Sequence, residues 1–230
     1  KIRGGEIMKR SRINEVIKDM EALIKEHGFE IPPFAKWTKE DWENVGHEYD
    51  EIRENALGWD ITDYGLGKFD EVGFAHLTIR NGNQKMPQKY PKTYAEKLLM
   101  LYEGQTAPLH YHWSKMEDII NCGGGNLMIK LYNSTKDENL ADTDVLVSID
   151  GVKKRFNAGS VVCIKPGESI TLTRGLYHRF WGEGGRVLVR EVSMCNDDAN
   201  DNRFYDKVGR FPEIEEDEEP LYLLCTEYDK

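Results

Sequence analysis

The chain has 230 residues, of which 39% are hydrophobic, and its 31 Lys and Arg against 41 Asp and Glu leave a formal net charge of −10. This length and composition predict one globular domain, because a chain of this size buries enough apolar surface to form a core. The acidic balance argues against a nucleic-acid partner, whose binding requires clustered Lys and Arg. The longest apolar runs are far shorter than the roughly 20 residues of a membrane-spanning helix.

The first seven residues are interpreted as an addition before a natural start at Met8, and they contain no apolar stretch typical of a secretory signal. The four cysteines lie 41, 32 and 30 residues apart, which fits neither a metal clip nor a disulfide framework. We therefore expect a reduced, cytoplasmic protein.

Residues 8–58 are predicted to be mostly helical. Apolar residues recur at helical spacing after Ser11 and before Gly28, at Ile13, Val16, Ile17, Met20 and Ile24. Thr38 followed by Asp41 resembles a capping box that opens a second helix near Trp42. These helices, residues 11–58, are expected to pack outside the barrel of the same domain and to contribute no metal ligand.

Residues 59–230 are predicted to form a β-barrel with a C-terminal extension, because short β-branched and aromatic runs alternate with turn dipeptides and no helical period intervenes. Within this part, Gly123–Gly125 is interpreted as a tight turn and the acidic run Glu213–Glu219 as a solvated loop. Leu221–Cys225 is interpreted as a final strand.

The residues that suggest chemistry lie in the stretch GQTAPLHYHWSKMEDIINCGG, residues 104–124. His110 and His112 would share one face of a strand, and a bend at residues 113–116 would return Glu117 to them. Asp118, one residue on, should face away. His178 is the downstream histidine in a comparable strand context. Three imidazoles and one carboxylate suit a divalent first-row metal and leave two positions open on an octahedral ion.

The order and spacing of Gly104, His110, His112, Glu117 and Gly124 resemble the first metal motif of the cupin superfamily. The second cupin motif is matched less well, with Gly159, the pair Pro166-Gly167 and His178 in order but a spacing one residue long. The resemblance implies a mostly β fold, a jelly-roll-like antiparallel barrel, and a metal site formed by His110, His112, Glu117 and His178.

A narrower resemblance extends from Met8 to the C-terminus. The stretches HYHWSKMEDIINCGGGNL and GLYHRFWGEGGRVLVREVSMCNDDANDNRF are similar to the D-lyxose ketol-isomerase family. The resemblance implies a Mn²⁺-dependent sugar isomerase that interconverts D-lyxose with D-xylulose and also accepts D-mannose and D-fructose. It further implies a small-molecule sugar as partner and a homodimer.

An aldose–ketose isomerase must move a proton between C1 and C2 through a cis-enediolate, which requires an acid–base group beside the metal. Glu191, flanked by Val189 and Val192, is the first candidate, and Lys115 could stabilise the changing charge on the substrate oxygen. We list as candidates for binding the substrate Lys97, Asp198 and Arg203.

Two other functions fit the same metal motif. A cupin oxygenase would hold Fe²⁺ with the same four ligands and place O₂ at an open position, and a non-enzymatic cupin would only bind a sugar or a metal. Turnover of D-lyxose with Mn²⁺ in the absence of O₂ would exclude both alternatives.

Overall fold

The structure is a computed structural model that describes residues 7–228. The expectation that residues 1–7 precede the natural start concerns a segment of which residues 1–6 lie outside the described part. The chain begins with β1 (Met8–Lys9) and α1 (Arg10–Glu26), and four short helical segments follow: η1 (Pro33–Lys36), α2 (Lys39–Glu43), η2 (His47–Tyr49) and α3 (Asp50–Glu54). None of the helices formed by the described residues is long and apolar enough to cross a membrane.

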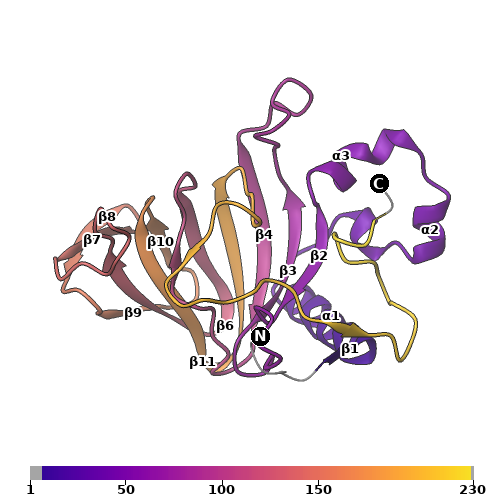
Figure 1. The fold of residues 1–230 in the computed structure, drawn as a ribbon. Helices are drawn as coiled ribbons and strands as arrows, with labels where there is room; N and C mark the ends of the chain where they lie inside the picture. Colours follow the sequence, from indigo (N-terminus) through magenta and orange to yellow (C-terminus); the bar gives the residue numbers. More distant parts are fainter. Residues whose placement is uncertain (1–6, 229–230) are drawn as a thin grey trace.

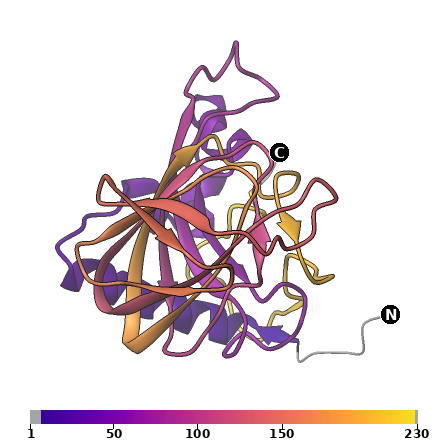
Figure 2. The ribbon, with the colours of Figure 1, turned by 90° about the vertical axis from the view of Figure 1, so that its left-hand side faces the viewer.

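Most of the remaining chain forms one large, strongly curved and antiparallel sheet (Figures 1 and 2). Its strands are β2 (Gly58–Thr62), β3 (Phe74–Arg80), β4 (Tyr94–Leu101), β5 (His110–Tyr111), β6 (Glu117–Asn133), β7 (Val145–Ile149), β8 (Val152–Phe156), β9 (Val161–Ile164), β10 (Ser169–Leu172), β11 (Leu176–Met194) and β12 (Arg203–Phe204). Along the sheet the order is β2-β3-β4-β11-β6-β10-β7-β8, while β9 pairs with β6, and β5 with β11 and β12. A separate parallel pair joins β1 to β13 (Ile214–Glu215). The predicted mostly β, cupin-like barrel with helices outside it is confirmed.

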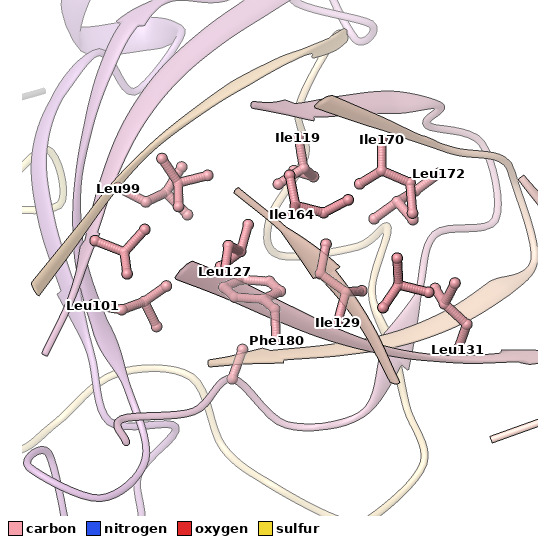
Figure 3. Close-up of a cluster of buried hydrophobic side chains, with 14 of the residues drawn as sticks. Leu99, Leu101, Ile119, Leu127, Ile129, Leu131, Ile164, Ile170, Leu172 and Phe180 are labelled. Carbon is pink, nitrogen blue, oxygen red and sulfur yellow. The ribbon is translucent and has the colours of Figure 1, made fainter. Parts of the chain in front are cut away.

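The two long strands β6 and β11 curve the sheet into a barrel, because each pairs with different neighbours along its length. One face of the sheet encloses an apolar core around Leu101, Ile129 and Phe180 (Figure 3). The other face carries Leu98 and Met100, against which α1 packs. The alternation of side chains along β4 thus supplies both layers.

Helix α1 lies on the outer face of the sheet through the apolar stripe expected from the sequence, whose five residues are fully buried. Burial of these side chains contributes on the order of 10 kcal/mol. The helix begins at Arg10, one residue before Ser11, and has no side-chain cap. Ser11 instead bonds Asp217 through its amide and hydroxyl groups, at 2.8 and 2.7 Å. The second helix, by contrast, has the capping box expected at Thr38 and Asp41.

Two local expectations are wrong. Gly123–Gly125 is not a turn but lies inside β6, where β11 passes so close that a Cβ on Gly124 would stand 2.0 Å from the Arg186 carbonyl oxygen. Leu221–Cys225 forms no strand, and only Leu224 makes an isolated bridge, to Trp59.

The acidic run Glu213–Glu219 is largely exposed, as expected of a solvated loop, but it is also held against α1. The buried guanidinium of Arg10 donates to Glu216 at 2.6 Å and also pairs with Glu227. These contacts close the C-terminal segment over the N-terminal helix (Figure 1).

Candidate functional site

A narrow cavity of about 30 Å³ lies within the barrel where β4, β5, β6 and β11 come together. His110 on β5 stands opposite His178 on β11 in the strand register. His112 follows two residues after His110, so both imidazoles face the cavity, whereas Tyr111 packs on Tyr177. Ligand nitrogens of the three histidines all lie within 4.8 Å of one another.

Backbone carbonyls fix the orientation of all three rings. The Nδ1 atoms of His110, His112 and His178 lie 2.8, 2.7 and 3.0 Å from the carbonyl oxygens of Pro108, Asp201 and Leu176. A carbonyl oxygen only accepts, so each Nδ1 carries the proton and donates it. Each Nε2 atom therefore presents a bare lone pair, and an imidazole oriented in this way is a typical metal ligand.

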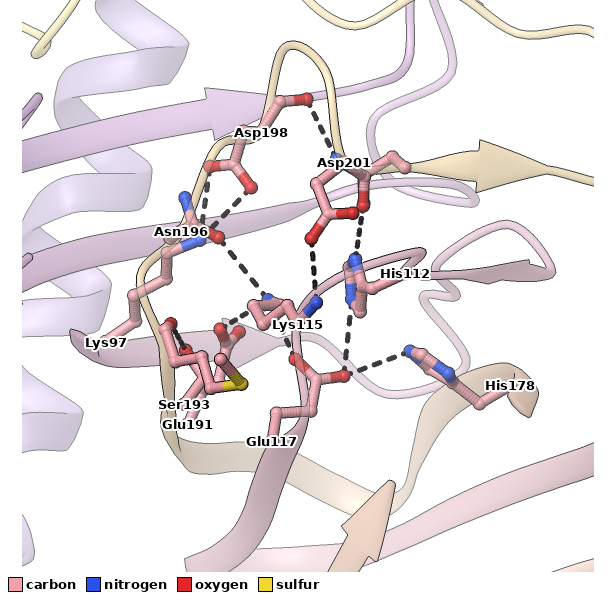
Figure 4. A network of polar contacts seen from close by, with 12 residues as sticks. Lys97, His112, Lys115, Glu117, His178, Glu191, Ser193, Asn196, Asp198 and Asp201 are labelled. Atoms are coloured by element: carbon pink, nitrogen blue, oxygen red, sulfur yellow. Dashed lines mark hydrogen bonds and ion pairs between the residues drawn. The ribbon is translucent and has the colours of Figure 1, made fainter. Parts of the chain in front are cut away.

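Glu117 completes the cluster from the first residue of β6. Its Oε1 atom lies 3.4 Å from His112 Nε2 and 3.3 Å from His178 Nε2 (Figure 4). A carboxylate oxygen facing two bare nitrogens brings acceptors together, an arrangement that a cation between them would stabilise. His178 Nε2 is buried and has no hydrogen-bond partner among the described residues. Three nitrogens and one oxygen therefore fit a divalent first-row metal ion.

Lys115 links this cluster to a second carboxylate. Its Nζ atom lies 2.8 Å from Glu117 Oε2 and 2.7 Å from Glu191 Oε1, and it also donates to Asn196 Oδ1 at 3.3 Å (Figure 4). Lys115, Glu117 and Glu191 are all buried. Glu191 thus lies in the cavity without contacting the imidazoles, one ammonium group away from the cluster.

Neighbouring charges determine the protonation states of the buried residues in this site. Burial raises the pKa of Glu117, but the ammonium group of Lys115 outweighs it and holds that pKa well below its usual range. Burial lowers the pKa of Lys115, but Glu117, Glu191 and Asp198 together raise it. Burial, with His178 and His112 nearby, lowers the pKa of His110 well below its usual range, so that this imidazole is neutral. The site therefore holds an ionised carboxylate, an ammonium group and a neutral ring side by side.

A second ion-pair group borders the cavity. Asp198 accepts from Lys97 at 3.1 Å and from Arg210 at 3.0 Å. Burial raises the pKa of Asp198, but Lys97 and Arg210 outweigh this effect and hold it well below its usual range. Arg210 also lies 3.7 Å from the buried Asp60 on β2. Burial raises the pKa of Asp60 to about 7.

Of the sequence-derived candidates, the structure brings the four expected ligands, Glu191, Lys115, Lys97 and Asp198 to one cavity. It does not bring Arg203 there. Since β12 pairs with β5, Arg203 stands opposite Tyr111 and Phe204 opposite His110. Phe204 therefore faces the cavity, while Arg203 points away and donates to Glu138 at 2.8 Å.

The other histidines lie elsewhere. His27 packs against Gly123 on β6, and the side chain of His47 is exposed. His76 is buried and lies 3.7 Å from Asp60. Asp118 is exposed and accepts from the Thr171 hydroxyl at 2.6 Å, so it faces away from the cluster as expected.

Sequence reasoning missed Arg210, Asn196 and Asp201. Asp201 orients the site twice, through its carbonyl on His112 and through its carboxylate, which accepts from the amide and hydroxyl of Ser114 and from the amide of Lys115. These residues belong to a loop whose path over the barrel no local pattern specifies. The one available signal was the polar composition of residues 196–203 directly after a long strand.

Comparison with known proteins identifies the family. The family model described as D-lyxose isomerase matches residues 8–228. The chain belongs to the D-lyxose isomerase family. It is 44% identical over 225 residues to the D-lyxose/D-mannose isomerase of Escherichia coli O157:H7, with 96% of this chain and 98% of the relative covered. The corresponding protein of Serratia proteamaculans is 43% identical over 96% of this chain and 98% of its own length. This member of the D-lyxose isomerase family is accordingly a sugar isomerase.

Solved structures of L-ribose isomerases share the fold of this family member. The Cellulomonas parahominis protein with L-ribose superimposes with a TM-score of 0.61 at 15% identity, covering 92% of this chain and 100% of the other. A mutant Acinetobacter protein with L-ribose gives a TM-score of 0.60 at 14% identity, with 92% and 99% covered. At these identities the likeness concerns the fold alone.

Proposed function

We propose that this protein converts D-lyxose to D-xylulose, and D-mannose to D-fructose, through a cis-enediolate. The observation that carries the proposal is the position of Lys115. Its ammonium group pairs both with Glu117, which belongs to the imidazole cluster, and with Glu191, which lies outside it. The names of the two relatives that are more than 40% identical over nearly the whole chain support the choice of sugars.

His110, His112, Glu117 and His178 would hold a divalent cation, for which Mn²⁺ is the choice that the family resemblance implies. When bound, this ion would supply Lewis-acid polarisation of the sugar oxygens at C1 and C2. The chain's own part is to keep the three Nε2 lone pairs bare and converging, which the carbonyls of Pro108, Asp201 and Leu176 accomplish.

Glu191 is the group that we propose moves the proton between C1 and C2. It lies in the cavity beside the cluster and contacts none of the imidazoles. Its carboxylate is therefore not needed as a metal ligand and can accept the substrate proton. Lys115 would donate to the substrate oxygen that gains negative charge, and Glu191 and Glu117 keep it in place for that task. A positioned acid–base group of this kind typically contributes roughly 10²–10⁴ in rate.

Lys97, Asp198 and Arg210 would bind the hydroxyl groups farther from the carbonyl carbon. Asp198 can accept from hydroxyl groups, and the two cations can donate to them. Phe74, Phe180 and Phe204 line the same cavity and would exclude water from the reacting carbons.

The test is an anaerobic assay of the metal-loaded protein with D-lyxose, in which D-xylulose is measured. Turnover without O₂ supports the isomerase and excludes an oxygenase, and turnover of any kind excludes a passive binding protein. Absence of xylulose with Mn²⁺, Co²⁺, Fe²⁺, Ni²⁺ and Zn²⁺ alike would contradict the proposal.

The homodimer and the cytoplasmic location also remain proposals. Four free thiols, at Cys122, Cys163, Cys195 and Cys225, are compatible with a reducing compartment. Sedimentation equilibrium would test the dimer, which the frequency of two-fold assemblies favours.

A further inference from the structure

A second cavity, of about 240 Å³, adjoins the first. Asp60 on β2 and His76 and Thr78 on β3 line it, together with Asn81 and the loop from Asn196 to Ala199. Asp198 lines both cavities. The register places the two cavities side by side, because Thr78 stands opposite Lys97, and Lys97 opposite Glu191, on neighbouring strands.

His76 lines this second cavity with a buried ring. The side chain is 2% exposed, and its Nδ1 atom has no hydrogen-bond partner among the described residues. Burial first, and then Lys97, lower the pKa of His76 well below its usual range, so the ring is neutral. A neutral imidazole carries its proton on one nitrogen and leaves the other as an acceptor, and Asp60 lies 3.7 Å from Nε2. Buried polar atoms without a partner are rare in folded proteins and require an explanation.

The two sugars of the proposed reaction differ at the end that would reach this place. D-mannose has the configuration of D-lyxose from C2 to C4 and continues for one further carbon away from the carbonyl group. If C1 and C2 lie at the imidazole cluster, the chain runs past Lys97, Asp198 and Arg210 toward the second cavity. The first cavity is small, at about 30 Å³, so a sugar bound at the imidazole cluster extends beyond it, and the second cavity, at about 240 Å³, offers room for the far end of the chain.

We propose, on the basis of the proposed function, that the second cavity is the subsite for the terminal hydroxymethyl group of a hexose, with His76 Nδ1 as acceptor of its hydroxyl proton. Asp198 then contacts the middle of the chain of either sugar. His76 and Thr78 determine chain-length specificity, because they meet only the hexose. The pentose ends before this cavity and leaves it to water.

The first experiment measures kcat/KM of the metal-loaded protein for D-lyxose, D-mannose and 6-deoxy-D-mannose. The deoxy sugar lacks the hydroxyl that His76 would accept, so its kcat/KM should lie about tenfold or more below that of D-mannose. In His76→Phe the preference for D-mannose over the deoxy sugar should fall to less than about twofold. Comparison of three sugars on the wild-type protein needs no variant to fold.

The second experiment fills the cavity. Thr78→Leu adds volume beside His76 and should lower the ratio of kcat/KM for D-mannose to that for D-lyxose by about tenfold or more. Thr173→Leu, the same change at an exposed position away from both cavities, should leave that ratio within about twofold.

Equal kcat/KM for D-mannose and its 6-deoxy form on the wild-type protein would overturn the role of His76. A Thr78→Leu protein in which both sugars lose activity in proportion would overturn the subsite. Wild-type protein that isomerises D-lyxose but not D-mannose would overturn the subsite together with the D-mannose activity, and would leave the D-lyxose isomerase function standing. Failure with both sugars would instead contradict the proposed function itself.

Discussion

Replacement of Glu191 by Gln separates catalysis from stability in this site. The change removes the charge and the basicity of the carboxylate but keeps an oxygen that can accept from Lys115, now 2.7 Å away. Lys115 also retains Glu117 at 2.8 Å, so its ammonium group does not become an unpaired buried charge. The variant is therefore expected to fold and to bind metal and sugar.

The expected magnitudes differ enough to be distinguished. Exchange of a charged hydrogen bond for a neutral one costs about 1 kcal/mol of stability, a shift of roughly 2–4 °C in Tm for a chain of this size. Loss of the proton-transfer group should lower kcat by roughly 10²–10⁴, which is about 3–5 kcal/mol in the activation barrier. The increase in the activation barrier should thus exceed the loss in free energy of unfolding several-fold.

The assay follows kcat for D-lyxose together with exchange of the C2 proton for deuterium in D₂O. The matched control is Glu96→Gln, a glutamate of the neighbouring strand β4 that is paired with Arg80 at 2.8 Å and does not line the cavity. The control should keep both rates within about threefold. Should Glu191→Gln exchange and isomerise at nearly the wild-type rate, proton transfer belongs to another residue, and Lys97 and Asp198 become the groups to test.

Three further outcomes are expected. His178→Ala should lose stoichiometric metal, measured by elemental analysis, and all metal-dependent turnover, while keeping its circular dichroism spectrum. His47→Ala, at an exposed position, should keep both its metal content and its turnover. Full metal content in His178→Ala would remove His178 from the site. Burial raises the pKa of Asp60 to about 7, so its neutral form contributes stability below pH 4 that is lost as the pH rises through 7. Asp60→Asn should therefore gain stability relative to wild type between pH 5 and pH 8, measured by urea unfolding. Parallel curves of unfolding free energy against pH for the two proteins would contradict this. Gly124→Ala should destabilise the protein by about 2 kcal/mol more than Gly151→Ala. Both glycines have positive φ, but only at Gly124 would the added Cβ meet backbone atoms. Equal urea midpoints for the two variants would refute the close approach of β11 to β6.

Most of the imidazole and carboxylate cluster was predictable because its geometry is local. His110, His112 and Glu117 lie within eight residues, and the alternation of a strand with one short bend is enough to place them on the same side. His178 was distant in the chain, but a strand context and the short list of histidines pointed to it. The strand runs were predictable for the same local reason, through their composition and the turn residues between them.

Features that depend on pairing between distant segments could not be predicted. Arg203 was expected at the substrate, and the antiparallel register of β12 with β5 turns it outward and Phe204 inward. Gly123–Gly125 was expected in a turn, since the sequence alone does not show that β11 crosses against that part of β6. Arg210 enters the site from a loop whose course depends on tertiary contacts.

That loop, residues 196–212, carries four polar residues of the site, Asn196, Asp198, Asp201 and Arg210, and is held at both ends. At its start the amide of Asn196 donates to Asn81 Oδ1 at 2.9 Å, and farther on the amide of Gly209 donates to the Tyr64 carbonyl at 2.8 Å. Directly after the loop, β13 pairs with β1, so that the chain becomes tied to the start of α1. Catalytic groups work when their supports fix them to within a fraction of an ångström. The N-terminal helix therefore contributes to the site although none of its residues lines the cavity: it anchors the segment that brings Asp198 and Arg210 to the cavity of the imidazole cluster.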